Sequence, residues 1–440
     1  MDLTIEKLIY GGDGLARLPA DEKGRGKAVF VPFVLEGEKV AATITEEKPG
    51  FARVRVNEIL EGSAARIEPK CPYFQRCGGC HYQHTSYEHQ LEIKSAILKE
   101  NLRRLAKLEL ASEIEVHASP PWNYRNRTRL QVRAEGEFAL GYFQFGSHTV
   151  LPVEECPISS PLINRAIAIL WKLGREGQIP EEWREIELFV NEDDTKLQLE
   201  LYCGPRLEKP QRAQAGRDFA ERLQHEMPEV ISIYVFAQTM SVERGAQARV
   251  SEGPDWTLRP GQFLYETKAA EFRVSGGSFF QVNRFLVDEL VSLVTANRSG
   301  DVALDLYAGV GLFTAAFGKG FGHIVAVESS HSAAADLPYN SGPNVKTVRA
   351  TVDQYLDGKG NKLRPDLVVV DPPRAGLGDR VARSLGKMDA RRLTYVSCDP
   401  ATLARDLVTL MAEGFRVEKV HLVDLFPQTF HIESVVQLVR

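Results

Sequence analysis

The sequence predicts three parts: a small β-barrel, a mixed α+β central domain and a C-terminal Rossmann-like α/β domain. Its 440 residues exceed what one hydrophobic core usually organises, and 43% of them are hydrophobic, enough for folded cores throughout. Short apolar runs that end in glycine-rich or polar loops recur after residue 276, as in a doubly wound sheet. We therefore expect domains at residues 1–67, 68–275 and 276–440.

The N-terminal part reads as short strands joined by tight turns. Residues 27–33 and 38–44 are rich in β-forming residues, and residues 11–14 and 35–38 carry turn signals. Small barrels of this kind often bind RNA. A barrel that only packs against its neighbour remains the alternative.

Four cysteines have the spacing of a metal site. Cys71, Cys77 and Cys80 form a C-x5-C-x2-C pattern, and Cys156 follows in the sequence Val-Glu-Glu-Cys-Pro. In a cytoplasmic protein such spacing favours metal binding over disulfides. Four thiolates suit zinc or an iron-sulfur cluster about equally. Cys203 lies in an alternating strand pattern and is expected to be packing.

Between the cysteines and the C-terminal domain, the pattern predicts a helix followed by mixed strands and helices. Residues 87–108 form an amphipathic helix with leucines on one face, and its basic residues are interpreted as a solvated face; these are Lys94, Lys99, Arg103, Arg104 and Lys107. Arg125, Arg127 and Arg129 are the clearest basic candidates to hold phosphates. A salt-bridged sheet face explains these arginines equally well.

The C-terminal domain places two acids at strand ends. Residues 302–307 form a strand that runs into a glycine-containing turn, where Thr314 replaces the third glycine of a dinucleotide fingerprint. Glu328 ends the next strand, where nucleotide-binding folds place an acid on ribose hydroxyls. Asp371 ends another buried strand at the same edge. Upstream, Asn283 is a candidate N-cap for the domain's first helix.

Cys398 and Glu433 are the candidate catalytic pair. Cys398 ends the apolar run 392–396, where a thiol can act as a nucleophile. Glu433 offers a carboxylate that could act as the base of a covalent cycle. A lone cysteine is more often inert packing, so the pair depends on the sequence around it.

Three blocks supply that context: residues 371–376 (Asp-Pro-Pro-Arg-Ala-Gly), residues 395–402 (Tyr-Val-Ser-Cys-Asp-Pro-Ala-Thr) and residues 424–433. In order and spacing they resemble the signature blocks of the RNA uridine-5-methyltransferases. With the N-terminal features, the resemblance covers nearly the whole chain. Asp399 stands where many members have Asn, which puts a second potential charge beside the thiol.

The resemblance implies a reaction and its participants. Cys398 would add to uracil C6, C5 would take the methyl group of S-adenosylmethionine, and Glu433 would remove the C5 proton before Cys398 is eliminated. It implies that residues around the turn and strand ends surround S-adenosylmethionine, namely Gln281, Tyr307, Glu328 and Asp371, with Asp353 a weaker candidate near adenine. It implies a [4Fe-4S] cluster on Cys71, Cys77, Cys80 and Cys156, and a TRAM-type barrel at residues 1–67.

Composition constrains location and partners. No apolar run reaches the ~20 residues of a membrane helix, and the acidic N-terminus lacks a signal peptide's basic start, so we expect a cytoplasmic monomer. The net charge of −5 requires RNA to meet a local basic surface. The resemblance favours large-subunit (23S) ribosomal RNA over transfer RNA. The rival functions are an amino methyltransferase using Asp371-Pro372-Pro373 and a non-enzymatic iron-sulfur RNA-binding protein.

Overall fold

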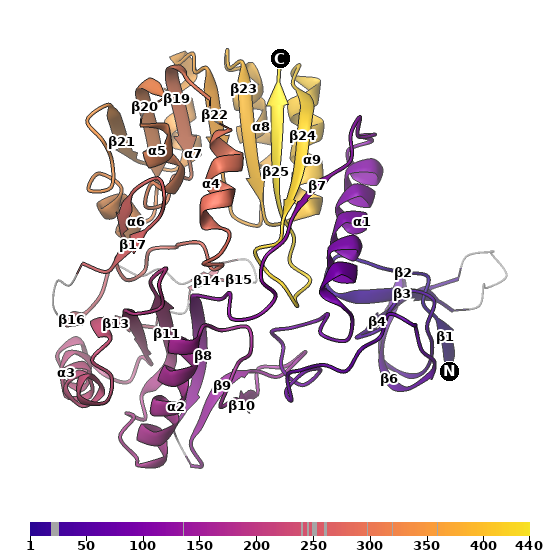
Figure 1. Cartoon of the computed structure of the whole chain (residues 1–440), viewed down its shortest axis with the longest axis vertical. Coiled ribbons are helices and arrows are strands. Elements are labelled where there is room, and N and C mark those ends of the chain that lie inside the picture. Colours follow the sequence, from indigo (N-terminus) through magenta and orange to yellow (C-terminus); the bar gives the residue numbers. More distant parts are fainter. Residues whose placement is uncertain are drawn as a thin grey trace.

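The computed structural model describes residues 1–18, 26–134, 136–238, 241–243, 246–248, 253–258, 262–296, 298–318, 320–358 and 360–440. Three large sheets organise the chain. In Figure 1 the C-terminal sheet lies at the top, the middle sheet at the lower left and the N-terminal sheet at the lower right. Within the described residues, no helix combines the length and apolar character needed to cross a bilayer.

The N-terminal sheet closes on itself as a barrel. Its strands lie in the order β1-β5-β6-β4-β3-β2, and they are β1 (Asp2–Thr4), β2 (Lys7–Leu8), β3 (Asp13–Arg17), β4 (Ala28–Pro32), β5 (Lys39–Glu47) and β6 (Phe51–Glu61). β1 and β2 sit at opposite edges and are joined by only two residues, Ile5 and Glu6. This short connection closes the sheet around alternating buried residues such as Val29 and Val31. The predicted N-terminal strand domain is confirmed.

The middle sheet has seven strands in the order β10-β9-β8-β11-β12-β13-β16. They are β8 (Arg127–Arg133), β9 (Ala139–Phe143), β10 (Val150–Pro152), β11 (Trp183–Val190), β12 (Leu197–Cys203), β13 (Val230–Ala237) and β16 (Trp256–Leu258). Helices α2 (Pro161–Arg175) and α3 (Lys209–Glu226) pack on it around Trp183 and Phe219. Two short hairpins follow, β14 (Ser241–Glu243) with β15 (Ala246–Ala248), and β17 (Leu264–Glu266) with β18 (Glu271–Arg273). Cys203 is fully buried in this core, as predicted.

The C-terminal sheet has eight strands in the order β21-β20-β19-β22-β23-β25-β24-β7. They are β19 (Gly300–Leu306), β20 (Phe321–Glu328), β21 (Val345–Arg349), β22 (Leu367–Val370), β23 (Arg392–Ser397), β24 (Arg416–Val423), β25 (Glu433–Val439) and β7 (Glu115–His117). β19 to β23 are parallel, and β25 is antiparallel to both of its neighbours. This is the predicted Rossmann-like α/β domain. Strand β7 was not predicted, and it joins from a segment more than 180 residues earlier in the chain.

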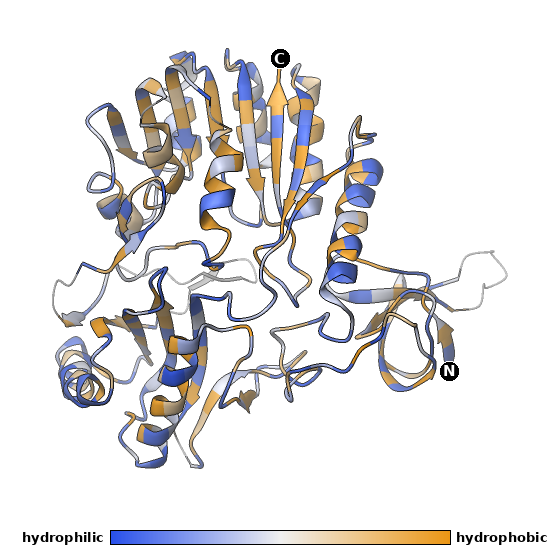
Figure 2. Cartoon of the chain, viewed as in Figure 1, coloured by the Kyte–Doolittle hydropathy of each residue, from blue (hydrophilic) through white to orange (hydrophobic). Residues whose placement is uncertain are grey.

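Helices cover both faces of the C-terminal sheet. One face packs against α1 (Tyr87–Leu105), α7 (Val352–Asp357), α8 (Gly378–Lys387) and α9 (Pro400–Ala412). The other packs against α4 (Val287–Thr295), α5 (Leu312–Phe317) and α6 (His331–Asp336). Alternate residues of the strands, such as Val368 and Val369, enter the two cores. In Figure 2, hydrophobic colour therefore recurs along the strands of this sheet, with hydrophilic positions between.

Three sequence interpretations need correction. Helix α1 ends at Leu105, and Lys94 is fully buried instead of solvated, because it pairs with Asp424. Asn283 does not cap α4, which begins at Val287; its side chain is buried and bonds Ser119. The residues of the 87–108 pattern that reach the core are Ile93, Ile97, Leu98 and Leu102, whereas Leu105 is half exposed.

The arginine series mostly forms the salt-bridged sheet face. Arg127 pairs with Glu187 and Glu200, and Arg129 pairs with Glu187. Arg125 is partly buried beside the predicted metal cysteines. Since these guanidinium groups are already engaged or enclosed, the strand that carries them is not a phosphate-binding surface.

Candidate active site

The topology brings Cys398 and Glu433 to one edge of the C-terminal sheet. Cys398 directly follows β23, and Glu433 is the first residue of β25, the antiparallel neighbour of β23. The last paired residues are Ser397 and Ser434, so Cys398 and Glu433 come next on the two strands. Asp371 follows β22 on the other side of β23. The thiol thus lies between two carboxyl groups.

Burial and these carboxyl groups raise the pKa values of the site. Burial, followed by the charges of Glu433 and Asp371, raises the pKa of Cys398 to about 12. Burial, and then Asp371, hold the pKa of Glu433 well above its usual range. Burial and Asp305 raise the pKa of Asp371 to about 7. A carboxylate with a raised pKa is a strong base, and perturbed groups of this kind concentrate at catalytic sites.

Arg374 is the positive charge that opposes this effect. It lowers the pKa of both Cys398 and Glu433, so it favours the thiolate and the carboxylate. Its Nη2 lies 3.2 Å from Nδ1 of His431, and burial followed by Arg374 lowers the pKa of His431 to about 3. The imidazole of His431 is therefore neutral, and the positive charge that favours the thiolate comes from Arg374.

The local structure explains why an aspartate is suited to position 399. Its carboxylate accepts hydrogen bonds from the backbone N–H groups of Ala401 and Thr402, at 3.0 and 2.9 Å, and so caps the N-terminus of α9. Asn can make the same cap, because Asn and Asp rank together at this position. The carboxylate of Asp399 is thus committed to the helix end.

Three of the predicted cofactor residues, Tyr307, Glu328 and Asp371, end or directly follow neighbouring strands. Tyr307 follows β19 with a φ of 62°, and a Cβ on Gly309 would meet nothing within 4 Å. The N–H of Gly309 donates to Oε2 of Glu328 at 2.8 Å, which holds that carboxylate at the end of β20. Gln281 is buried, and its backbone carbonyl accepts from Asn126. Asp353 lies in the first turn of α7 and is half exposed.

The loop of residues 424–432, which leads to Glu433, is held by hydrogen bonds from helix α1 and from the segment that precedes it. Lys94 Nζ donates to Asp424 at 2.6 Å and to the carbonyl of Phe426 at 2.9 Å. The N–H groups of His81 and Tyr82 donate to the carbonyl of Gln428 at 2.8 and 3.0 Å. Sequence reasoning missed this clamp, although Lys94 lies three residues after Leu91 and four before Leu98, on the helix face assigned to the core.

The N-terminal barrel also reaches the site. The hydroxyl of Tyr10 donates to the backbone carbonyl of Cys398 at 3.0 Å, and its ring packs edge-on against Phe430 at 5.5 Å. Burial raises the pKa of Tyr10, and the nearby Asp399 raises it further, so the hydroxyl stays protonated as a donor. Nothing in the sequence around Tyr10 indicated this contact, which spans 388 positions.

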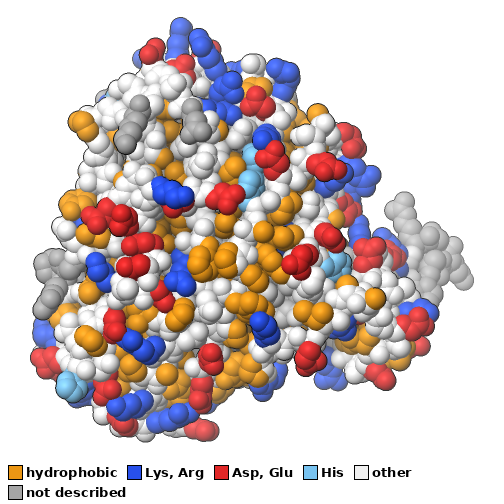
Figure 3. Space-filling view, viewed as in Figure 1, with side chains coloured by type: hydrophobic (Ala, Val, Ile, Leu, Met, Phe, Trp, Pro, Cys, Tyr) orange, Lys and Arg blue, Asp and Glu red, His pale blue; other side chains and the backbone are white. Residues whose placement is uncertain are grey.

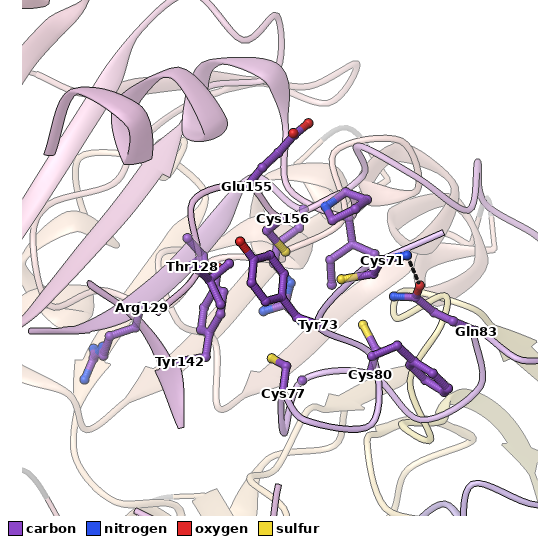
Figure 4. A pocket seen from close by; sticks show the side chains of 16 residues that line it. Cys71, Tyr73, Cys77, Cys80, Gln83, Thr128, Arg129, Tyr142, Glu155 and Cys156 are labelled. Atoms are coloured by element: carbon purple, nitrogen blue, oxygen red, sulfur yellow. Dashed lines mark hydrogen bonds between the residues drawn. The ribbon is translucent and has the colours of Figure 1, made fainter. Parts of the chain in front are cut away.

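The four predicted metal cysteines line a single cavity of about 250 Å³. Figure 4 shows the side chains of Cys71, Cys77, Cys80 and Cys156 around a common space. Burial raises the pKa of Cys77 to about 11 and raises that of Cys80 still more, whereas Arg125 lowers both. Gln83 accepts from the backbone N–H of Cys71 at 3.1 Å and fixes that end of the cavity.

The surface in Figure 3 mixes charges. Lys and Arg side chains alternate with Asp and Glu across the face shown, and hydrophobic side chains gather near its centre. This face therefore carries no broad basic field, in keeping with the net charge of −5.

Comparisons with known proteins agree with this geometry. The family described as tRNA (Uracil-5-)-methyltransferase matches residues 86–440, and the TRAM domain matches residues 1–56. The chain belongs to the tRNA (uracil-5-)-methyltransferase family. It is an RNA methyltransferase with an N-terminal TRAM domain, and the predicted family is confirmed.

Relatives match this family member along its whole length. A protein of Aquifex aeolicus named as an uncharacterized RNA methyltransferase is 32% identical over 446 residues, which cover 100% of this chain and 98% of the relative. One of Thermotoga maritima with the same name is 30% identical over 449 residues, with the same coverage. The crystal structure of Pyrococcus abyssi tRNA (uracil-54, C5)-methyltransferase in complex with S-adenosyl-L-homocysteine has a TM-score of 0.73, 23% identity and 100% coverage of both chains. That likeness supports the fold.

Proposed function

We propose that the protein methylates C5 of a uridine in RNA through a covalent adduct between Cys398 and uracil C6, with S-adenosylmethionine as the methyl donor. The observation that carries the proposal is the position of Cys398 beside Glu433 across the ends of β23 and β25. A thiol and a base with a raised pKa at one sheet edge are the two groups that the reaction requires.

The chemistry assigns one role to each group. Cys398 loses its proton to solvent, and its Sγ forms a bond to C6, which moves an electron pair towards C5 and the C4 oxygen. C5 then attacks the methyl carbon of the donor, the bond between that carbon and the donor's sulfonium sulfur breaks, and the neutral thioether leaves. Glu433 takes the C5 proton, the electron pair restores the C5–C6 double bond, and the bond from C6 to Sγ breaks. Arg374 assists by stabilising the anionic forms of Cys398 and Glu433.

The strand ends of β19, β20 and β22 fit the methyl donor. S-adenosylmethionine, when bound, supplies a methyl group on a positively charged sulfur. The open side of Gly309 admits a ligand close to the backbone. Glu328 is held at a position suited to ribose hydroxyls, and we assign Gln281, Tyr307 and Asp371 to the same binding site.

We also propose that Cys71, Cys77, Cys80 and Cys156 hold a [4Fe-4S] cluster. Four soft sulfur donors around one cavity of about 250 Å³ suit a group larger than a single zinc ion. Arg125 at the cavity offsets the negative charge of four thiolates. Cys80 directly precedes His81, which holds the 424–432 loop, so the cluster's role is structural.

Metal analysis of anaerobically purified protein tests this assignment. Four iron and four sulfide per chain are expected. One zinc per chain and no sulfide would show that the cysteines hold zinc and not a cluster.

The proposed substrate is ribosomal RNA, on the resemblance of the barrel and the four cysteines to that branch of the family; transfer RNA is the alternative. Protein incubated with methyl-labelled S-adenosylmethionine and separate pools of unmodified ribosomal and transfer RNA tests both points. Label in 5-methyluridine from ribosomal RNA is expected. Label from transfer RNA alone would overturn the substrate, and label on an amino nitrogen would favour the amino methyltransferase reading.

A further inference from the structure

The edge of the C-terminal sheet carries a group of ligand atoms that the proposed reaction does not use. It lies where β7 pairs in parallel with β24, and its members are Glu115, His117 and His421. Nε2 of His117 lies 3.0 Å from Nδ1 of His421, which lies 3.3 Å from Oε2 of Glu115. We propose that these three side chains bind one divalent transition-metal ion of the zinc class.

Two of the three spacings between the ligand atoms already match a tetrahedral metal, and all three atoms lie within 4.8 Å of one another. With metal–nitrogen bonds of about 2.0–2.1 Å, neighbouring ligand atoms of a tetrahedral zinc lie roughly 3.3 Å apart. The two distances from Nδ1 of His421 are 3.0 and 3.3 Å. An ion can therefore enter with small shifts of the side chains, and two imidazoles with one carboxylate are a known zinc ligand set.

A fourth residue orients one of the ligands. Oε1 of Glu289, in the first turn of α4, lies 2.6 Å from Nδ1 of His117. Metal-binding histidines commonly donate their other ring N–H to a carboxylate, which fixes the ring and directs the free nitrogen at the ion. Here that bond directs Nε2 of His117 towards His421, which is almost fully buried.

The surroundings leave one carboxylate oxygen of Glu115 and the solvent available to the ion. Lys419 pairs with Oε1 of Glu115 at 2.6 Å, so Oε2 remains available. The side chains of Lys419 and Glu115 are 42% and 47% exposed, so the ammonium can turn to solvent and water can complete the coordination. Without metal, the same atoms form the hydrogen-bonded chain from Glu289 to Glu115, which is the competing reading.

The site would fasten a weakly held strand. β7 has three residues, and the carbonyl of His117 accepts from the N–H of Asp424 at 2.9 Å, at the start of the loop that leads to Glu433. A metal bridge between β7 and β24 would therefore stabilise the base of that loop.

Zinc binding to the full chain, with its cysteine site loaded, tests the proposal. We compare the wild type with His117→Gln and with His323→Gln, an exposed histidine on β20 of the same sheet. After dialysis against a fixed Zn²⁺ concentration, the wild type and His323→Gln should each retain one more zinc than His117→Gln. Zinc should also raise the Tm of the wild type and of His323→Gln, but not that of His117→Gln. Equal zinc content and equal Tm shifts in all three proteins would overturn the site in favour of the hydrogen-bonded chain.

Two further measurements keep the test decisive. Glu289→Gln alters only the orienting group, which is half exposed, so it should fold and weaken zinc binding about 10- to 100-fold. Unchanged affinity in this variant would contradict the assigned geometry. Co²⁺ in place of Zn²⁺ should bind without strong sulfur-to-cobalt absorption, whereas that absorption would place the ion on cysteine.

Discussion

The two candidate sites of this protein both hold thiols with raised pKa values, and they differ in what surrounds the sulfur. Cys398 is a single thiol at the end of β23, with Glu433 on the neighbouring strand and Arg374 nearby. The sulfurs of Cys77 and Cys80 face other thiols across a cavity. A raised pKa therefore does not identify a nucleophile. The neighbours do, because a carboxyl base serves a covalent cycle and converging thiols serve a metal.

The most severe test of this contrast is Cys398→Ala. We expect methyl transfer to fall by at least about 10⁴-fold, since the nucleophile is lost. Affinity for S-adenosylmethionine, measured by calorimetry, should stay within about twofold, because Cys398 does not belong to the donor site. Cys203→Ala, at a buried cysteine of the middle sheet, is the control and should retain most activity. Comparable losses of activity in the two variants would contradict the assignment of Cys398 as the nucleophile.

Lys94→Met tests how much the contact between helix α1, which follows the cysteine segment, and the loop before Glu433 contributes to stability. Lys94 lies on α1, after the cysteine segment, and its buried ion pair with Asp424 anchors the loop before Glu433. Removing one partner leaves an uncompensated buried charge, so the free energy of unfolding should fall by about 3–5 kcal/mol. Denaturant unfolding measures this loss.

The double variant Lys94→Met/Asp424→Leu is the matched control. It removes both charges, and we expect it to regain at least half of the lost stability. A double variant as unstable as Lys94→Met would mean that the aliphatic packing of α1, and not the ion pair, holds the loop.

The pH dependence should separate the reacting thiol from an already ionised one. Cys398 has a pKa near 12, so at neutral pH most of it is protonated. Raising the pH increases the thiolate fraction and also ionises Glu433, whose pKa is raised as well. The single-turnover rate should therefore rise at least about tenfold per pH unit from pH 7 to 9, since the ionisation of the thiol alone gives that slope. A flat profile would indicate that the thiolate forms before the measured step.

The smallest expected effect belongs to Tyr10→Phe. This change removes the hydrogen bond to the carbonyl of Cys398 and keeps the ring against Phe430. One such bond is worth about 1 kcal/mol, so kcat should fall about fivefold with little change in KM for RNA. A change in KM alone would instead assign Tyr10 to RNA binding.

The sequence predicted what local patterns and motif blocks encode. Strand runs with polar ends gave the C-terminal sheet, and the blocks around Cys398 and Glu433 gave the candidate site. The contacts that support the site join distant positions, such as Lys94 with Asp424 and Tyr10 with Cys398. A single sequence does not display such partners, so Lys94 was interpreted as solvated. Strand β7 escaped because three residues are too few for a periodic signal.

The central claim is that Cys398 forms the adduct and Glu433 resolves it, and Glu433→Gln tests it most directly. The variant is incubated with RNA and S-adenosylmethionine, digested with nuclease and protease, and examined by mass spectrometry at the peptide that contains Cys398. We expect that peptide to carry a methylated uridine nucleotide, because the C5 proton has no base to remove it. Free 5-methyluridine released at the wild-type rate, with no modified Cys398 peptide, would contradict the account.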